Sequence, residues 1–97
     1  MWRHGDVLID KAKVPKAAVA RPRPILAEGE LTGHAHRIAD PRTAVLLEHD
    51  GTRYLRVTAK TATVVHEEHA PIELPRGEYR VWRQREYTPQ VIRIVRD

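Results

Sequence analysis

The stretch TAVLLEHDGTRYLRVT, residues 43–58, decides how the fold is interpreted from the sequence. Apolar and β-branched residues stand on both sides of Asp50-Gly51, and this dipeptide suits a two-residue hairpin turn because both residues accept a positive φ angle. After the turn, apolar and polar side chains alternate, with Leu55 and Val57 on one face of an extended strand. The stretch therefore predicts two antiparallel strands, 43–49 and 52–58.

Short strand-like runs continue on both sides of this hairpin, and no dozen residues show helical periodicity. Three prolines make 14–24 a loop or extended connector, and Pro71 and Pro75 predict that 67–77 turns. The fold class that follows is all-β: a single domain, residues 1–97, built as a small β-barrel or β-sandwich with hairpin connections. The further strands that we predict are 5–10, 25–38 (an extended pair broken near Gly29 or Gly33), 61–66, 78–87 and 89–97.

Composition limits the classes of function. The 97 residues contain 17 basic and 13 acidic side chains, a net charge of +4 that permits an anionic partner without requiring one. The absence of cysteine excludes disulfides and thiolate metal sites. The opening MWRHGDVLID has early charges and no apolar core, so we expect neither a signal peptide nor a membrane anchor, no membrane partner, and a cytoplasmic protein.

Four of the six histidines stand in two short words, GHAHR at 33–37 and HEEH at 66–69. His34 and His36 are two residues apart, so on a strand both imidazoles project from the same face. His66 is expected to point inward, and a turn at Pro71 would bring His69 back beside it. The predicted metal ligands are therefore His34, His36, His66 and His69, whereas His4 and His49, which have no companion at ligand spacing, are expected at the surface.

Nitrogen ligands predict a divalent transition metal, Zn above all, with Fe, Ni or Mn as alternatives. Three histidines and a water would form an open, catalytic arrangement, and four protein ligands a closed, structural one. Glu67 and Glu68 could each bind the metal, orient a histidine or act as general base. The alternative that needs no metal is a cluster of histidines that binds an anion or donates hydrogen bonds.

The strand EYRVWRQREY at 78–87 interleaves arginines with aromatic residues, which is typical of a surface that binds single-stranded nucleic acid or clamps an anionic substrate. Glu78 and Glu86 dilute this charge and favour an ordinary core strand instead. Arg37, Arg85 and Tyr87 are the residues that we expect to bind a substrate.

The words GELTGHAHRI, HEEHAPIELPRGEYRVWRQREYTP and HGDVLI resemble those of a small bacterial and phage-associated family of unassigned function. The resemblance places the following residues inside the family's characteristic words: His34, His36, His66, His69, Arg85, Glu86 and Tyr87. A looser similarity is to cupins, metal-binding β-barrels with a His-x-His pair on a strand and a Pro-x-Gly turn, here Pro75-Arg76-Gly77. This chain departs from that pattern because Arg80, and no histidine, follows the turn.

Three functions follow as expectations. The first is a metal-dependent hydrolase of a small anionic substrate, with Glu67 or Glu68 as base and Arg85 holding the anion. The second is a non-enzymatic, metal-stabilised module that binds nucleic acid or protein, and the third is a ligand-binding barrel without metal. Because small β domains expose edge strands, we also expect a homo-oligomer.

Overall fold

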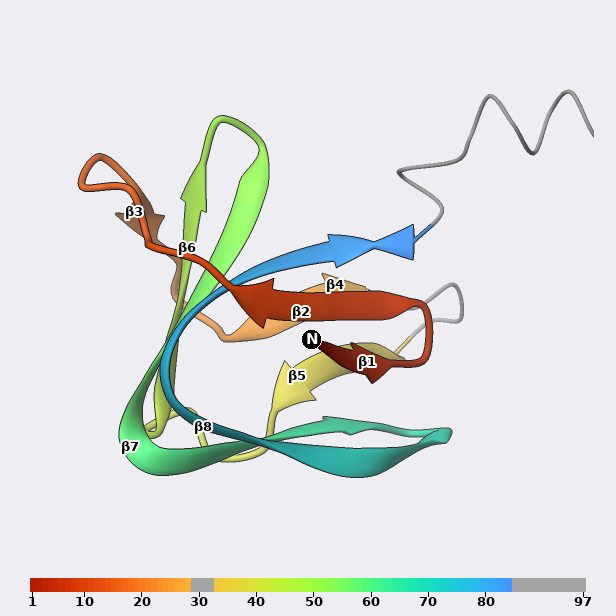
Figure 1. Cartoon of the computed structure of the whole chain (residues 1–97). Coiled ribbons are helices and arrows are strands. Elements are labelled where there is room, and N and C mark those ends of the chain that lie inside the picture. Colours follow the sequence, from red (N-terminus) through yellow and green to blue (C-terminus); the bar gives the residue numbers. More distant parts are fainter. Residues whose placement is uncertain (29–32, 85–97) are drawn as a thin grey trace, which may run out of the picture.

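A computed structural model of the chain describes residues 1–28 and 33–84. Within these ranges the protein is all-β, and eight antiparallel strands form one strongly curled sheet with the shape of a half-barrel (Figure 1). The predicted fold class is thereby confirmed. The strands are β1 (Trp2–His4), β2 (Val7–Lys11), β3 (Val19–Ala20), β4 (Ile25–Glu28), β5 (Ala35–Ile38), β6 (Ala44–His49), β7 (Thr52–His66) and β8 (His69–Arg83).

The hairpin between β6 and β7 forms as its sequence predicts. Asp50 and Gly51 have φ angles of 51° and 77°, the positive pair that a two-residue turn needs to match the twist of its strands. Leu46 lies opposite Leu55 in the register. This alignment places both leucines in the core, where they are almost completely buried.

β7 and β8 form one long hairpin, and here two predictions are wrong. Residues 52–58 and 61–66 were expected as separate strands, but both lie in β7, with a register shift between Val57 and Thr61. Residues 67–77 were expected to turn, but β8 begins at His69 and continues through both prolines. The prolines are tolerated because the first half of β8 pairs only with β7, so its other edge needs no backbone N–H donor.

The order of the strands curls the sheet. The neighbours run β1-β2-β8-β7-β5-β4, while β6 pairs with the first half of β7 and with β3. β2 pairs with the second half of β8, and β5 with the second half of β7, so the two ends of the long hairpin have different neighbours. The bend between these ends leaves the β1–β2 hairpin facing β5 and the tip of the β7–β8 hairpin (Figure 1).

The predicted strand 5–10 is also corrected. Gly5 and Asp6 form a tight turn between β1 and β2, so the strand begins at Val7, and Gly5 adopts a φ of 63°. The predicted pair 25–38 appears as β4 and β5, which are antiparallel. The residues 14–24 are a connector, as expected, and contain only the two-residue strand β3.

The core lies inside the curl and depends on aliphatic side chains and one tyrosine. Tyr79 is fully buried, packs against the edge of the Trp2 ring at 5.4 Å between centroids, and donates its hydroxyl to the carbonyl of Pro75. Arg80 on the other face of β8 covers the ring of Trp82 at 4.7 Å. This part of the basic aromatic strand is therefore a core strand with an arginine over an aromatic ring, as the presence of Glu78 favoured.

Among residues 1–28 and 33–84 no helix could cross a membrane. The predicted strand 89–97 and the predicted site residues Arg85 and Tyr87 lie outside the described residues, as does Gly29.

Candidate metal centre

Five imidazoles gather where the β1–β2 turn, the start of β5 and the tip of the β7–β8 hairpin meet. The closest ring centroids are those of His36 and His66, at 4.4 Å, and of His66 and His69, at 4.7 Å. His4 stands edge-on to His36 at 5.0 Å, and His34 edge-on to His66 at 5.6 Å. All four predicted ligands therefore belong to one cluster, which also contains a fifth histidine.

Local structure explains how these side chains meet. His36 and Ile38 alternate with half-buried neighbours on β5, so both point inward and are 3% exposed. His66 and His69 are the last cross-strand pair before the tip of the β7–β8 hairpin, and directly opposed residues bring their side chains together. The three-residue spacing works through strand pairing, and not through the turn at Pro71 that we expected.

The geometry suits a metal ion. His36, His66 and His69 each offer a ring nitrogen, and these three atoms lie within 4.8 Å of one another. With Zn–N bonds of about 2.0–2.1 Å, two ligand atoms of a tetrahedral zinc are about 3.3 Å apart. Small rotations of the rings would therefore bring the three nitrogens to ligand spacing.

A second group of three has the same spacing but a less available carboxylate. His34, His66 and Glu67 also offer atoms within 4.8 Å of one another. The Ala35 N–H donates to Glu67 Oε1 at 3.1 Å, and Arg37 donates to Glu67 Oε2 at 2.9 Å, so both oxygens are occupied. Backbone N–H groups, first that of Glu67 itself and then that of Ala35, together with Arg37 lower the pKa of this carboxyl to about 2. Glu67 is therefore a weak base.

Arg37 is the partner of Glu67 in this ion pair. This predicted substrate-binding residue pairs with Glu67 and donates to the Ala35 carbonyl at 3.1 Å. The pair ties the tip of the β7–β8 hairpin to β5 beside the cluster.

Glu68 lies at the outer edge of the site. Its side chain is 62% exposed, with Oε2 at 3.8 Å from His34 Nδ1. Its backbone N–H donates to His66 Nδ1 at 3.0 Å. Since this bond requires a bare Nδ1, ligation by His66 through either ring nitrogen would replace it. Such an exposed bond is worth about 1 kcal/mol, which is small against a metal–nitrogen bond.

His4 is the residue that sequence reasoning missed. It was expected at the surface but is 2% exposed and lies inside the cluster. Its Nδ1 is 2.8 Å from His36 Nδ1, and its Nε2 donates to the carbonyl of Ala70 at 3.0 Å. Both partners are more than 30 residues away in the chain, so spacing within the sequence had no signal to offer. His49 lies apart from the cluster, with Nε2 at 3.3 Å from Asp50.

Burial keeps the inner histidines neutral. Desolvation, together with the neighbouring imidazoles, lowers the pKa of His36 to about 4 and also lowers the pKa of His4. The neutral imidazole is the form that binds a metal, because the ligand nitrogen must carry no proton.

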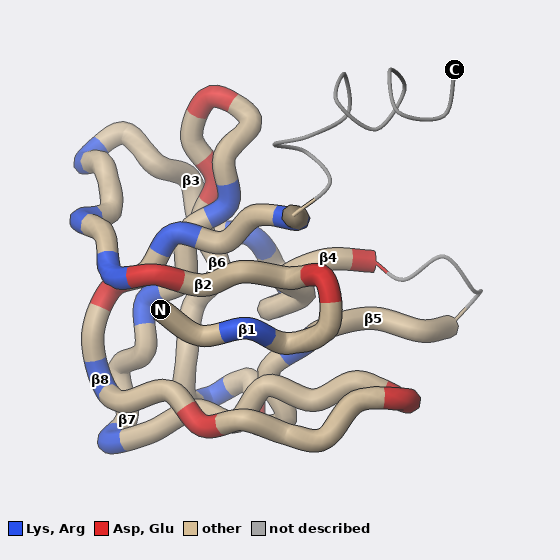
Figure 2. Tube along the Cα trace, turned by 45° about the vertical axis from the view of Figure 1, so that its right-hand side comes forward, with Lys and Arg blue, Asp and Glu red and all other residues tan. Residues whose placement is uncertain are grey.

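The charges around the cluster favour a cation. The β1–β2 turn carries Asp6, and the tip of the β7–β8 hairpin carries Glu67 and Glu68. Both acidic positions fall on the same side of the molecule (Figure 2). Arg37 offsets the charge of Glu67, so Asp6 and Glu68 are the carboxylates that attract a cation to the cluster.

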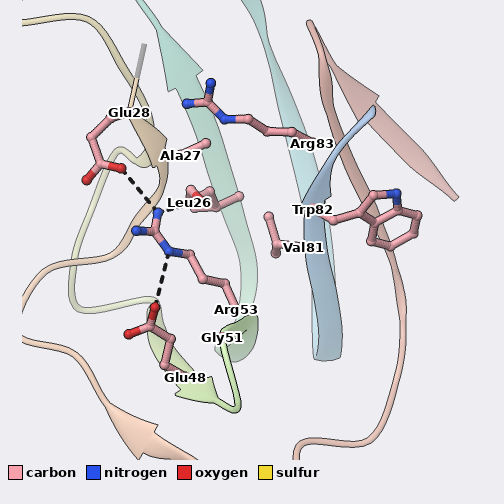
Figure 3. Close-up of a pocket in the computed structure, with 9 residues that line it drawn as sticks. All are labelled: Leu26, Ala27, Glu28, Glu48, Gly51, Arg53, Val81, Trp82 and Arg83. Atoms are coloured by element: carbon pink, nitrogen blue, oxygen red, sulfur yellow. Dashed lines mark hydrogen bonds and ion pairs between the residues drawn. The ribbon is translucent and has the colours of Figure 1, made fainter. Parts of the chain in front are cut away.

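A cavity of about 440 Å³ lies elsewhere, between β4, β7 and β8 (Figure 3). Arg53 crosses it, donates to the Leu26 carbonyl at 2.9 Å, and pairs with Glu28 and Glu48 at 3.4 and 3.8 Å. Because these contacts already match the charge of Arg53, the guanidinium gives no support for an anionic substrate there.

The fold and the cluster together define a class: an all-β half-barrel that carries a group of histidines at one end. The chain belongs to the family described as a domain of unknown function (DUF8820), which matches residues 3–84 and so includes the whole cluster. No curated protein and no solved structure matches the chain. Membership in a family of unassigned function is thus confirmed, while the association with phages and the similarity to cupins stay predictions.

Proposed function

We propose that this protein binds one divalent transition metal ion, preferentially Zn²⁺, through His36, His66 and His69. The observation that carries the proposal is the spacing of three ring nitrogens within 4.8 Å, contributed by two separate elements, β5 and the β7–β8 hairpin. Imidazole suits zinc, iron, nickel and copper better than magnesium or calcium. Zinc is preferred because it imposes no electronic geometry on its ligands.

The ion would act as a cross-link. Residue 36 is 30 positions from residue 66, and no covalent bond joins β5 to the hairpin tip, since the chain has no cysteine. A metal held by both elements would add metal–nitrogen bonds to the strand pairing that already joins β5 to β7. We therefore favour a metal-stabilised, non-enzymatic module over an enzyme.

A metal-dependent hydrolase is the competing function, and the contacts of Glu67 weaken the case for that residue as its general base. A general base must be close to the metal-bound water and basic enough to accept its proton. Glu67 is engaged by Arg37 and by backbone N–H groups, which leaves Glu68 as the base among the predicted residues within the described part of the chain. Turnover of simple esters or phosphoesters by the zinc-loaded protein, abolished by Glu68→Gln, would contradict the non-enzymatic proposal.

Metal stoichiometry tests the proposal directly. The untagged protein, stripped with chelator and reloaded with Zn²⁺, is expected to bind one equivalent by elemental analysis and calorimetry. His36→Ala and His66→Ala should each lose it, and His49→Ala, a histidine outside the cluster, should retain it. A parent protein that binds no zinc, iron, nickel or manganese would overturn the proposal.

A further inference from the structure

The β1–β2 turn lies against the metal centre and takes no part in the ligand set proposed above. His4 at the end of β1 and the turn residues Gly5 and Asp6 all lie against the proposed ligands. We propose that this turn completes the centre: His4 holds His36 in the tautomer that binds metal, and Asp6 supplies a fourth ligand. This inference rests on the proposed function and specifies its coordination.

The first step concerns the protons on two imidazoles. His4 Nε2 faces the carbonyl of Ala70, which can only accept, so Nε2 must carry the proton. A neutral His4 then has a bare Nδ1, and the 2.8 Å contact between the two Nδ1 atoms requires His36 to donate. His36 therefore holds its proton on Nδ1 and presents a bare Nε2.

This arrangement is the one that metal sites use. A ligand histidine usually donates its other ring N–H to an acceptor, which fixes both the tautomer and the orientation of the ring. Carboxylates and carbonyls are the usual acceptors, and here a second histidine has that role. Because His4 is 2% exposed and anchored on Ala70, its ring is held in place.

The second step concerns Asp6. Its Oδ1 is 3.5 Å from His36 Nε2, the nitrogen that the tautomer leaves bare. Two ligands of a tetrahedral zinc are about 3.3 Å apart, so this pair already has ligand spacing. Asp6 is 44% exposed on a turn, and its carboxylate can therefore swing toward an ion without disturbing the core.

The third step concerns Gly5, which lets the turn approach. A Cβ at this position would stand 2.7 Å from His69 Nε2 and 3.1 Å from His36 Cε1. The turn thus lies directly against the rings of both histidines. With Asp6 bound, the centre is closed by protein ligands, which agrees with a structural metal and leaves no position for a reactive water.

Cobalt spectroscopy separates a ligand from a positioning residue. The full chain, stripped and loaded with Co²⁺, is expected to show the visible bands of a tetrahedral ion. Asp6→Asn should change the energies of these bands and weaken Zn²⁺ binding by roughly ten- to a hundredfold, as Asp6 contacts the ion. Asp10→Asn, a half-exposed carboxylate on the neighbouring strand that pairs with the N-terminus at 3.6 Å, is the matched control and should change neither.

His4 should affect affinity and not the spectrum. His4→Leu removes the acceptor, and Zn²⁺ binding should fall by roughly ten- to a hundredfold with Co²⁺ bands that keep their positions. His4→Asn places an amide oxygen where Nδ1 stands and should recover most of the affinity, which also controls for a folding defect in His4→Leu.

The tautomer can be measured without metal. Nitrogen-edited NMR of the metal-free protein should show His36 protonated on Nδ1, and protonation on Nε2 would overturn the role of His4. If the parent binds Zn²⁺ but Asp6→Asn behaves like Asp10→Asn, the ligand role of Asp6 fails and the proposed function stands. If the parent binds no metal, the proposed function fails, and this inference fails with it.

Discussion

Gly5 combines two constraints in one residue: its φ of 63° favours glycine, and any Cβ would collide with the imidazole of His69. We predict that Gly5→Ala lowers metal affinity several-fold, because His69 is exposed and will move aside rather than unfold the turn. Stability of the metal-free protein should fall by only about 1–2 kcal/mol, the cost of an L-residue in this conformation. Calorimetric titration with Zn²⁺ and urea unfolding measure the two effects.

Gly51→Ala is the matched control for this substitution. Gly51 has a φ of 77°, and a Cβ added there would meet no atom of the described residues within 4 Å. Its conformational cost is therefore similar, and its effect on metal binding should be absent. Equal metal affinities for the two variants would contradict the role assigned to Gly5.

Tyr79 predicts how stability depends on alkaline pH. Burial raises the pKa of its hydroxyl, because the charged phenolate would lose its water. The unfolded chain releases this proton first, so the contribution is complete below pH 10 and is lost as the pH rises through the higher folded-state value. Urea unfolding at pH 8, 9, 10 and 11 should show this decline in the parent.

Tyr79→Phe is the variant that isolates the effect. The substitution removes the hydrogen bond to Pro75 and should lower the free energy of unfolding at pH 8 by about 1 kcal/mol. The stability of the variant should then decline less than that of the parent between pH 9 and 11. The same decline in the variant as in the parent would assign the alkaline loss to other groups.

The β6–β7 hairpin is the element that the sequence predicts best, and its turn can be tested by itself. Gly51→Asn should be less destabilising than Gly51→Ala, since asparagine tolerates a positive φ and a two-residue turn of this type accepts it. We expect a loss of about 1 kcal/mol or more for alanine and a few tenths for asparagine in denaturant unfolding. An equal loss for both would mean that the turn does not limit stability.

The β7–β8 hairpin shows where prediction from local signals stops. Its prolines predict a turn, yet they lie in a strand. Whether a strand tolerates proline depends on its neighbours in the sheet, because only a paired edge needs backbone N–H groups. The first half of β8 pairs only with β7, and the curl of the whole sheet decides that no strand pairs with its other edge. The pairing of His66 with His69, and so the core of the candidate site, follows from that strand.

Metal binding should stabilise the whole domain. An ion that binds only the folded state adds about 2.7 kcal/mol when it is present at about a hundred times its Kd. For a domain of this size such a gain raises the midpoint of thermal unfolding by roughly 10–20 °C. Scanning calorimetry with Zn²⁺ and with chelator measures the shift, which His36→Ala should abolish and His49→Ala should retain. No shift in the parent would contradict a structural metal.

Within the described residues, β1, β3 and β4 each pair with a single neighbour and are therefore edge strands of the half-barrel. Strand edges offer unpaired backbone groups to a second copy, so the homo-oligomer expected from the sequence stays a prediction. Sedimentation equilibrium over a range of concentrations checks it, and a monomer at every concentration would contradict it.

The sequence by itself determined the all-β class, the β6–β7 hairpin, the absence of thiolate ligands and the grouping of four histidines. These follow from signals within a few residues: alternation, a turn dipeptide, composition and spacing. Only the tertiary structure decided that His4 joins them, that Glu67 is occupied by Arg37, and that Asp6 stands beside His36 Nε2. Each of these contacts joins residues about 30 positions apart, and the partners meet because one curled sheet brings the β1–β2 turn against β5 and the tip of the long hairpin.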